Sequence, residues 1–277
     1  MKKTILLFSG LAFAASMASA QVISLNFIPS GDGGFNTTVA DLDLEPTDVA
    51  GVVPAANWNN VRSSGQNYDD FTQGNLVDGT GTVVPGMEFA WASAGDGGGF
   101  KIDGDITSTP NRKMMGAALG TWEANNDVTY TVSGLSADFT GPGYFVYAYW
   151  GGQSVDFGEA TDEIIDLYTM GGTGESFVMG YTGQTVEGTS YWDGDFSQSL
   201  ISSLGDFENP GDFGAYNYIV FSGLTADNFT ITITQGQDRR HGQISGLQIV
   251  AIPEPGTYAA LFGLAALGIL VLLRRRA

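Results

Sequence analysis

The chain of 277 residues contains no cysteine. This absence excludes disulfides, thiol nucleophiles, cysteine-ligated zinc and iron–sulfur clusters. The chain also has a single histidine, His241, which excludes any metal site with two histidine ligands and leaves at most one Ser-His-Asp triad. No nucleophile elbow of the G-x-S-x-G type lies near His241, so the sequence gives no support to a hydrolase triad.

Basic residues are scarce, with 11 Lys and Arg against 30 Asp and Glu. Five of the bases lie at the two ends, at positions 2, 3 and 274–276, where Glu254 is the one acid. The body from residue 21 to residue 252 therefore carries six bases and 29 acids, a net charge near −23. Such a surface repels phosphate backbones, and we expect no nucleic-acid partner. Excess carboxylate keeps a protein soluble and can recruit divalent cations.

The N-terminus has the order of a secretory signal peptide. Lys2 and Lys3 are followed by an apolar run at residues 5–15 and by the small residues Ala18-Ser19-Ala20. This order predicts a signal peptide at residues 1–20 and a mature protein that begins at Gln21.

The C-terminus combines three elements in sequence. Pro253-Glu254-Pro255 precedes an uncharged apolar stretch at residues 258–273, which is followed by Arg274-Arg275-Arg276. As a helix, the apolar stretch would span roughly 24 Å, close to the thickness of a bilayer core. Because arginine favours the cytoplasmic side, we expect the C-terminus to face inward and the body to face outward.

These three elements resemble the PEP-CTERM sorting signal. In that family the motif is recognised by an exosortase, a membrane-embedded processing enzyme. The resemblance implies that residues 253–277 are a sorting and anchor segment in the inner membrane, and that an exosortase is a partner. It further implies export in a Gram-negative-type bacterium and a final place at the cell surface or in the extracellular matrix of a biofilm. The implied sorting residues are Pro253, Glu254, Pro255, Arg274, Arg275 and Arg276.

The body has the composition of an all-β protein. The chain has 40 glycines, and short β-branched or aromatic runs alternate with Gly, Asp, Asn and Ser clusters. Strands are expected at residues 22–27, 128–132, 144–150, 218–221, 229–234 and 244–251, with weaker candidates at 82–84, 100–102, 164–168 and 176–179. A helical turn fits residues 114–119. About ten strands predict one β-sandwich, jelly-roll-like, at residues 21–252. The order strand, Ser245-Gly246-Leu247, strand is similar to the closing edge of galactose-binding-like and malectin-like sandwiches.

Closely spaced carboxylates suggest calcium, which prefers six to eight hard oxygen ligands. The candidate ligands are Asp103, Asp105, Asp193 and Asp195. A further cluster contains Asp41, Asp43, Glu45 and Asp48. None of these matches the EF-hand pattern, and solvated turn carboxylates are the alternative.

Two tryptophans beside polar residues suggest a carbohydrate-binding site, because sugar rings stack on aromatic faces while amides and acids bond their hydroxyls. These pairs are Trp58-Asn59 and Trp192-Asp193. Packing of the indoles in the core or at its rim is the alternative.

Three functions follow, in order of preference. The first is a structural or adhesive surface protein without enzymatic activity and without catalytic residues. The second is a lectin-like, calcium-assisted module for extracellular polysaccharide. The third is a glycan-active enzyme with paired carboxylates, for which Glu163 and Asp166 have poor spacing, since residues three apart on a strand point to opposite faces.

Overall fold

The computed structural model describes residues 21–29, 39–62, 70–94, 97–101, 109–121, 127–151, 163–182, 194–200, 202, 216–235 and 243–253. Residues 21–252 belong to one compact unit. Statements about the structure below concern these described residues.

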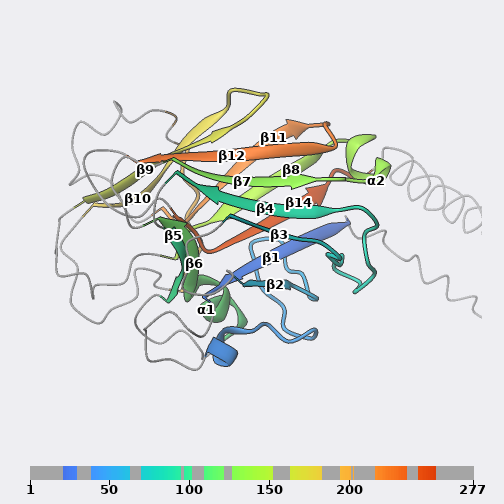
Figure 1. Cartoon of the computed structure of the whole chain (residues 1–277), viewed down its shortest axis with the longest axis horizontal. Helices are drawn as coiled ribbons and strands as arrows, with labels where there is room; N and C mark the ends of the chain where they lie inside the picture. The colour runs from blue at the N-terminus through green and yellow to red at the C-terminus, as the bar shows by residue number, and fades with distance from the viewer. Residues whose placement is uncertain are drawn as a thin grey trace, which may run out of the picture. The chain divides into compact units, whose positions relative to one another are not determined.

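One five-stranded sheet contains both ends of the body (Figure 1). Its order is β11 (Tyr218–Leu224), β8 (Tyr144–Tyr149), β14 (Gly246–Ala251), β1 (Val22–Ile28) and β2 (Asn59–Arg62). β14 runs antiparallel to both of its neighbours, and β1 runs parallel to β2.

A six-stranded antiparallel sheet forms the second layer. Its order is β10 (Ser176–Thr182), β9 (Glu163–Met170), β12 (Asn228–Gln235), β7 (Val128–Ser133), β4 (Glu88–Ser93) and β3 (Phe71–Gln73). A small third sheet joins β13 (Gln243–Ile244), β6 (Ala117–Thr121) and β5 (Gly97–Lys101). The helical segments are η1 (Val39–Leu42), α1 (Pro110–Met115) and α2 (Ala137–Thr140).

The core lies between the two larger sheets, where alternate residues of each strand meet. Leu25 and Phe27 of β1 belong to the same buried cluster as Phe89 of β4 and Tyr130 of β7. The ring of Phe27 lies 5.1 Å from that of Phe89 and 5.9 Å from that of Tyr130. The predicted all-β sandwich is therefore confirmed.

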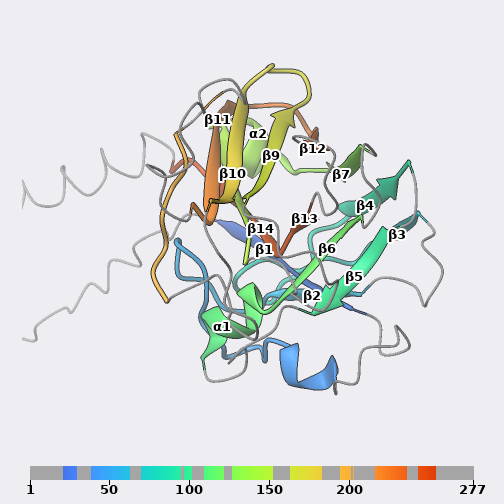
Figure 2. The same cartoon turned by 90° about the vertical axis from the view of Figure 1, so that its left-hand side faces the viewer.

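A second, smaller cluster covers the outer face of the five-stranded sheet. It includes Leu44, Trp58, Met114, Met115 and Tyr149. Helix α1 lies on the side of β1 and β2 in both views (Figures 1 and 2). Thr109 caps this helix by accepting a hydrogen bond from the backbone N–H of Arg112 at 3.2 Å.

The expected strands and the observed ones differ in several places. The expected helical turn at residues 114–119 covers only the end of α1, because Gly116 ends the helix and Ala117 begins the fully buried strand β6. The candidate at 82–84 makes only an isolated bridge, between Val83 and Val77. The run at 244–251 is divided at Ser245 into β13 and β14. Strands β2, β3, β4 and β6 were not predicted.

Candidate functional site

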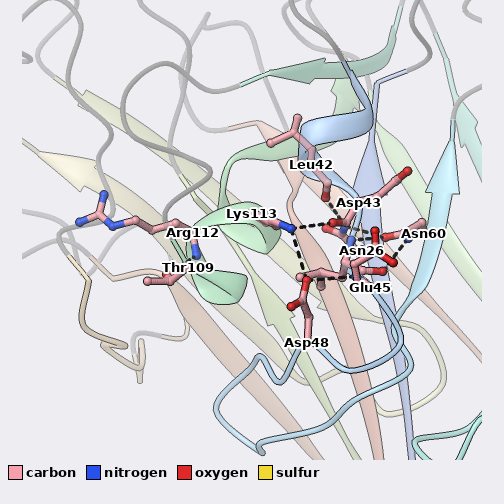
Figure 3. A network of polar contacts seen from close by, with 10 residues as sticks. Asn26, Leu42, Asp43, Glu45, Asp48, Asn60, Thr109, Arg112 and Lys113 are labelled. Carbon is pink, nitrogen blue, oxygen red and sulfur yellow. Dashed lines mark hydrogen bonds and ion pairs between the residues drawn. The ribbon is translucent and has the colours of Figure 1, made fainter.

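The most extensive polar network holds a layer of chain over the five-stranded sheet. We call residues 39–58 together with α1 the cover layer. In it, the ammonium group of Lys113 donates to the backbone oxygen of Asp43 at 3.2 Å and to Oδ2 of Asp48 at 3.3 Å (Figure 3). The Asp43 carboxylate also accepts from Arg62 of β2, at 2.5 and 2.6 Å. These two acids of the 41–48 cluster therefore have cationic partners.

Two asparagines join the cover layer to the sheet (Figure 3). Nδ2 of Asn26, in β1, donates to the backbone oxygen of Leu42 at 3.0 Å and to Oδ1 of Asn60 at 2.9 Å. Asn60, in β2, donates to the backbone oxygen of Leu44 at 3.0 Å and accepts from the N–H of Leu44 at 3.1 Å. The amides thus substitute for a strand partner that the backbone at residues 42–44 lacks.

A third connection centres on Gln248, a buried amide in the middle of the sheet. Its Nε2 donates to the backbone oxygen of Val53 at 2.8 Å and to Oγ of Ser24 at 3.2 Å, and its Oε1 accepts from the Tyr149 hydroxyl. The N–H of Val52 donates to the Tyr149 hydroxyl at 3.0 Å. Burial raises the pKa of Tyr149, so this hydroxyl stays neutral and can donate.

Gly51 brings the cover layer close to that amide. Its φ of +91° lies in the left-handed region, and a Cβ at this position would stand 2.3 Å from Oε1 of Gln248. Its N–H donates to Oδ1 of Asn111 at 2.9 Å, which ties the loop to α1. Only glycine fits here without moving Gln248.

Both residues of the predicted sugar-binding pair Trp58-Asn59 are buried. Trp58 is 4% exposed, and its indole N–H donates to the backbone oxygen of Ala55 at 2.9 Å. The amide of Asn59 donates to the backbone oxygens of Ser24 and Val77, at 3.0 and 2.8 Å. A buried indole offers no ring face to a sugar, and we assign both residues to packing.

Asp195 is the one predicted calcium ligand among the residues that the structure describes. Asp103, Asp105, Trp192 and Asp193 lie outside the described residues. Asp195 is exposed, and its backbone oxygen accepts from the Asn217 amide at 2.9 Å. Within the described ranges, no three acidic or histidine side chains are grouped so that they could hold a metal ion. Calcium binding therefore stays a prediction.

Asp78 shows how an isolated carboxylate is used in a turn. Its Oδ1 accepts from the N–H and hydroxyl of Thr80, at 2.8 and 2.6 Å, and from the N–H of Thr82 at 3.1 Å. Burial acts to raise the pKa of Asp78, but the hydrogen bonds from Thr80, Thr82 and Gln21 outweigh it and hold the pKa below the usual value of 3.8. The role of this carboxylate is to stabilise the turn.

An aromatic cluster on the outer face of the five-stranded sheet was not predicted. It consists of Tyr147, Tyr218 and Phe196, all partly exposed, above the buried Tyr149. The rings of Tyr147 and Tyr218 are 6.4 Å apart at 24°, and Phe196 meets Tyr218 edge-on at 6.2 Å. Burial raises the pKa of Tyr147, and the neighbouring Tyr218 adds to the effect. The available signal was the alternation in residues 144–149, which places every second ring outside the core.

The sorting residues follow directly on the body. Pro253 comes two residues after the end of β14, while Glu254, Pro255 and Arg274 to Arg276 lie outside the described residues. None of the described helices is long and apolar enough to cross a bilayer, and the predicted span at 258–273 is not among them.

The geometry defines an acidic β-sandwich whose first and last strands, β1 and β14, pair side by side. The particular assignment comes from its tail, because residues 251–276 match the family model of the PEP-CTERM protein-sorting motif. The chain carries this motif, which confirms the resemblance inferred from the sequence. It is an exported protein that an exosortase processes, with C-terminal sorting to the cell surface.

Other comparisons add little. No curated protein sequence matches the chain. Among solved structures, it is similar to an exo-β-1,3-galactanase from Phanerochaete chrysosporium in complex with β-1,3-galactotriose, with 15% identity and a TM-score of 0.28. The match covers 55% of this chain and 26% of the galactanase chain. Similarity at this level carries no inference about function.

Proposed function

We propose that the exported body is a structural or adhesive component of the cell surface or extracellular matrix, and that it is not an enzyme. The observation that carries the proposal is the use of polar groups in the cover layer. Arg62 and the amides of Asn26, Asn60 and Gln248 fix that layer to the sheet, and Lys113 joins its two segments, α1 and residues 39–58. Charged and amide side chains, which enzymes use in catalysis, here make the fold rigid. A structural module under mechanical load requires such rigidity.

A deletion strain tests this role. We expect cells that lack the protein to lose part of their matrix cohesion or surface attachment, and full-length protein supplied from a plasmid to restore it. A chain truncated after Ile252 is the matched control, since it keeps the body and loses the sorting motif. Unchanged cohesion and attachment in the deletion strain would contradict the proposal.

Carbohydrate binding is the second candidate, and the aromatic cluster favours it. Partly exposed rings at Tyr147, Tyr218 and Phe196 offer apolar faces for stacking on sugars, with the Gln198 amide 3.5 Å from the Tyr218 hydroxyl. The strongly acidic body favours a neutral polysaccharide over an anionic one.

Binding of the body, residues 21–252, to a panel of neutral polysaccharides tests this candidate. We expect saturable binding that Tyr147→Ala or Tyr218→Ala weakens at least tenfold, while Thr232→Ala on the other sheet leaves it unchanged. Parallel measurements with calcium and with a chelator test the predicted calcium site. If the folded body binds no member of the panel, the carbohydrate-binding candidate fails and the structural role is the proposal that remains.

A further inference from the structure

The first and last residues of the body are neighbours in the five-stranded sheet. Strands β1 and β14 pair antiparallel, with Val22 opposite Val250. The N–H of Ala251 donates to the backbone oxygen of Gln21 at 2.9 Å. Since β14 lies between β1 and β8, its end is paired on both sides. The residue that follows the predicted signal peptide and the residues that precede the sorting motif therefore share one end of the sandwich.

Pairing continues right up to the sorting motif. The N–H of Ile252 donates to the backbone oxygen of Gly143 at 2.8 Å, and Pro253 follows immediately. The matched sorting region begins at residue 251, so Ala251 and Ile252 belong both to that region and to the hydrogen-bonded sheet. No spacer separates the folded body from the motif.

The linker between the folded body and the predicted membrane span is also short. Five residues, 253–257, separate Ile252 from the predicted membrane span. Fully extended, they reach at most about 18 Å. An enzyme at the membrane that takes Pro253-Glu254-Pro255 must therefore work within that distance of a folded body.

We propose that exosortase and the sheet compete for the backbone of Ala251 and Ile252, so that processing requires the end of β14 to open. A processing enzyme that takes an extended segment needs access to the backbone on both sides of its motif. Here the N-terminal side is held by the bonds to Gln21 and Gly143. Each residue that leaves the sheet adds about 3.3 Å of reach, and strand ends are among the segments that open most readily. The folded body thereby slows its own release from the tail.

The test is a pulse–chase measurement of tail removal from the full-length chain in a host that contains the exosortase. One variant carries eight Gly and Ser residues between Ile252 and Pro253, which gives the motif a spacer. A second, Ile252→Pro, removes the N–H that bonds to Gly143 and adds no length. We expect both to be processed roughly three- to tenfold faster than the natural chain, the range that corresponds to one or two net hydrogen bonds.

Two matched controls keep the result specific. Ile252→Ala retains the N–H, and the same eight residues inserted after Gly172 extend an exposed turn that has free space around it. Both are expected to be processed at the natural rate. An unchanged or slower rate in the spacer variant overturns the proposal, because a slower rate means that the enzyme needs the body at its natural distance. Equal acceleration by the Gly172 insertion also overturns it, since general loosening would then be the cause.

Discussion

Strands β1 and β7 have similar alternating patterns but different surroundings. In β7, Val128, Tyr130 and Val132 are buried and the threonines between them are partly exposed. In β1, all seven residues are buried, including Ser24 and Asn26 at the positions that face away from the core. The difference arises because the cover layer lies over the five-stranded sheet. An alternating strand therefore tells which residues enter the core, but not whether the opposite face is open.

The two faces of β1 are stabilised in different ways. The inner face is apolar, and each side chain contributes through burial and dispersion contacts. The outer face uses Asn26 and, through β14, Gln248, whose hydrogen bonds reach the cover layer. Such amides stabilise the structure only while their partners are present, since an unsatisfied buried amide costs about 1–3 kcal/mol. We therefore expect the inner face to determine global stability and the outer face to determine whether the cover layer stays attached.

The largest expected effect is on the inner face. Phe27→Ala removes a ring that is 0% exposed and packs on Phe89 and Tyr130. We expect a loss of about 3–5 kcal/mol in the free energy of unfolding of the body, measured by urea titration. Thr232→Ala, on the open face of β12, is the matched control and should change it by less than about 1 kcal/mol. Similar losses for the two variants would show that the two surroundings are not energetically distinct.

The sequence predicted the core-facing strands of the two larger sheets far better than it predicted the cover layer. Every strong β run matches strand over most of its length, because local alternation and β-branched residues determine it. Strand β4 was missed although Phe89 and Trp91 alternate with alanine, since its small residues have little β propensity. Trp58 was a candidate sugar-binding residue, with packing as the alternative, because it stands beside asparagines. Those asparagines bond instead to the backbone oxygens of Ser24 and Leu44. That arrangement depends on segments distant in sequence, which no local pattern reveals.

A pH titration sharpens the contrast from the inner side. Tyr144 is buried, and burial together with the charge of Asp227 raises its pKa from 10.0 to about 12. The unfolded chain ionises first as pH rises, so the contribution is complete below pH 10 and is lost as the pH approaches 12. We expect this ionisation to lower the free energy of unfolding by about 3 kcal/mol, given 1.36 kcal/mol per pKa unit.

Tyr144→Phe is the comparison for that titration. It should flatten the alkaline decline, although it starts from a lower stability because the hydroxyl no longer donates to the backbone oxygen of Ala226. The readout is the free energy of unfolding of both proteins between about pH 9 and pH 12, which is roughly the range in which tyrosine titrates. Parallel curves would show that the pKa of Tyr144 is the same in the folded and the unfolded chain.

Substitutions at two glycines distinguish the cost of backbone strain from the cost of a steric clash between the cover layer and the sheet. Gly51→Ala and Gly86→Ala both place alanine at a positive φ, of +91° and +75°. At Gly86 the new Cβ meets nothing within 4 Å, whereas at Gly51 it collides with the hydrogen-bonded Gln248. We expect Gly51→Ala to cost about 1–3 kcal/mol more than Gly86→Ala, with faster proteolysis of residues 50–55. Equal costs would mean that the cover layer yields without loss.

The smallest effect concerns the ion pairs of the cover layer. Lys113 and Asp48 are each 22% exposed in their side chains, so solvent screens their attraction. We expect Lys113→Met to lower the free energy of unfolding by about 0.5–1 kcal/mol, and the Lys113–Asp48 coupling in a double-mutant cycle with Asp48→Asn to shrink in 1 M salt, where screening acts over about 3 Å.

Arg62→Met is the matched variant for a more exposed pair, whose side chains are 39% and 31% exposed. It should cost no more than Lys113→Met, because the Asp43 carboxylate that it leaves behind can be hydrated. Coupling well above 1 kcal/mol for Lys113 and Asp48 would reverse the ranking of interactions on this face. Charge, rather than the buried amides of Asn26 and Gln248, would then be the main stabiliser of the cover layer, and the stability of that layer would vary with the ionic strength outside the cell.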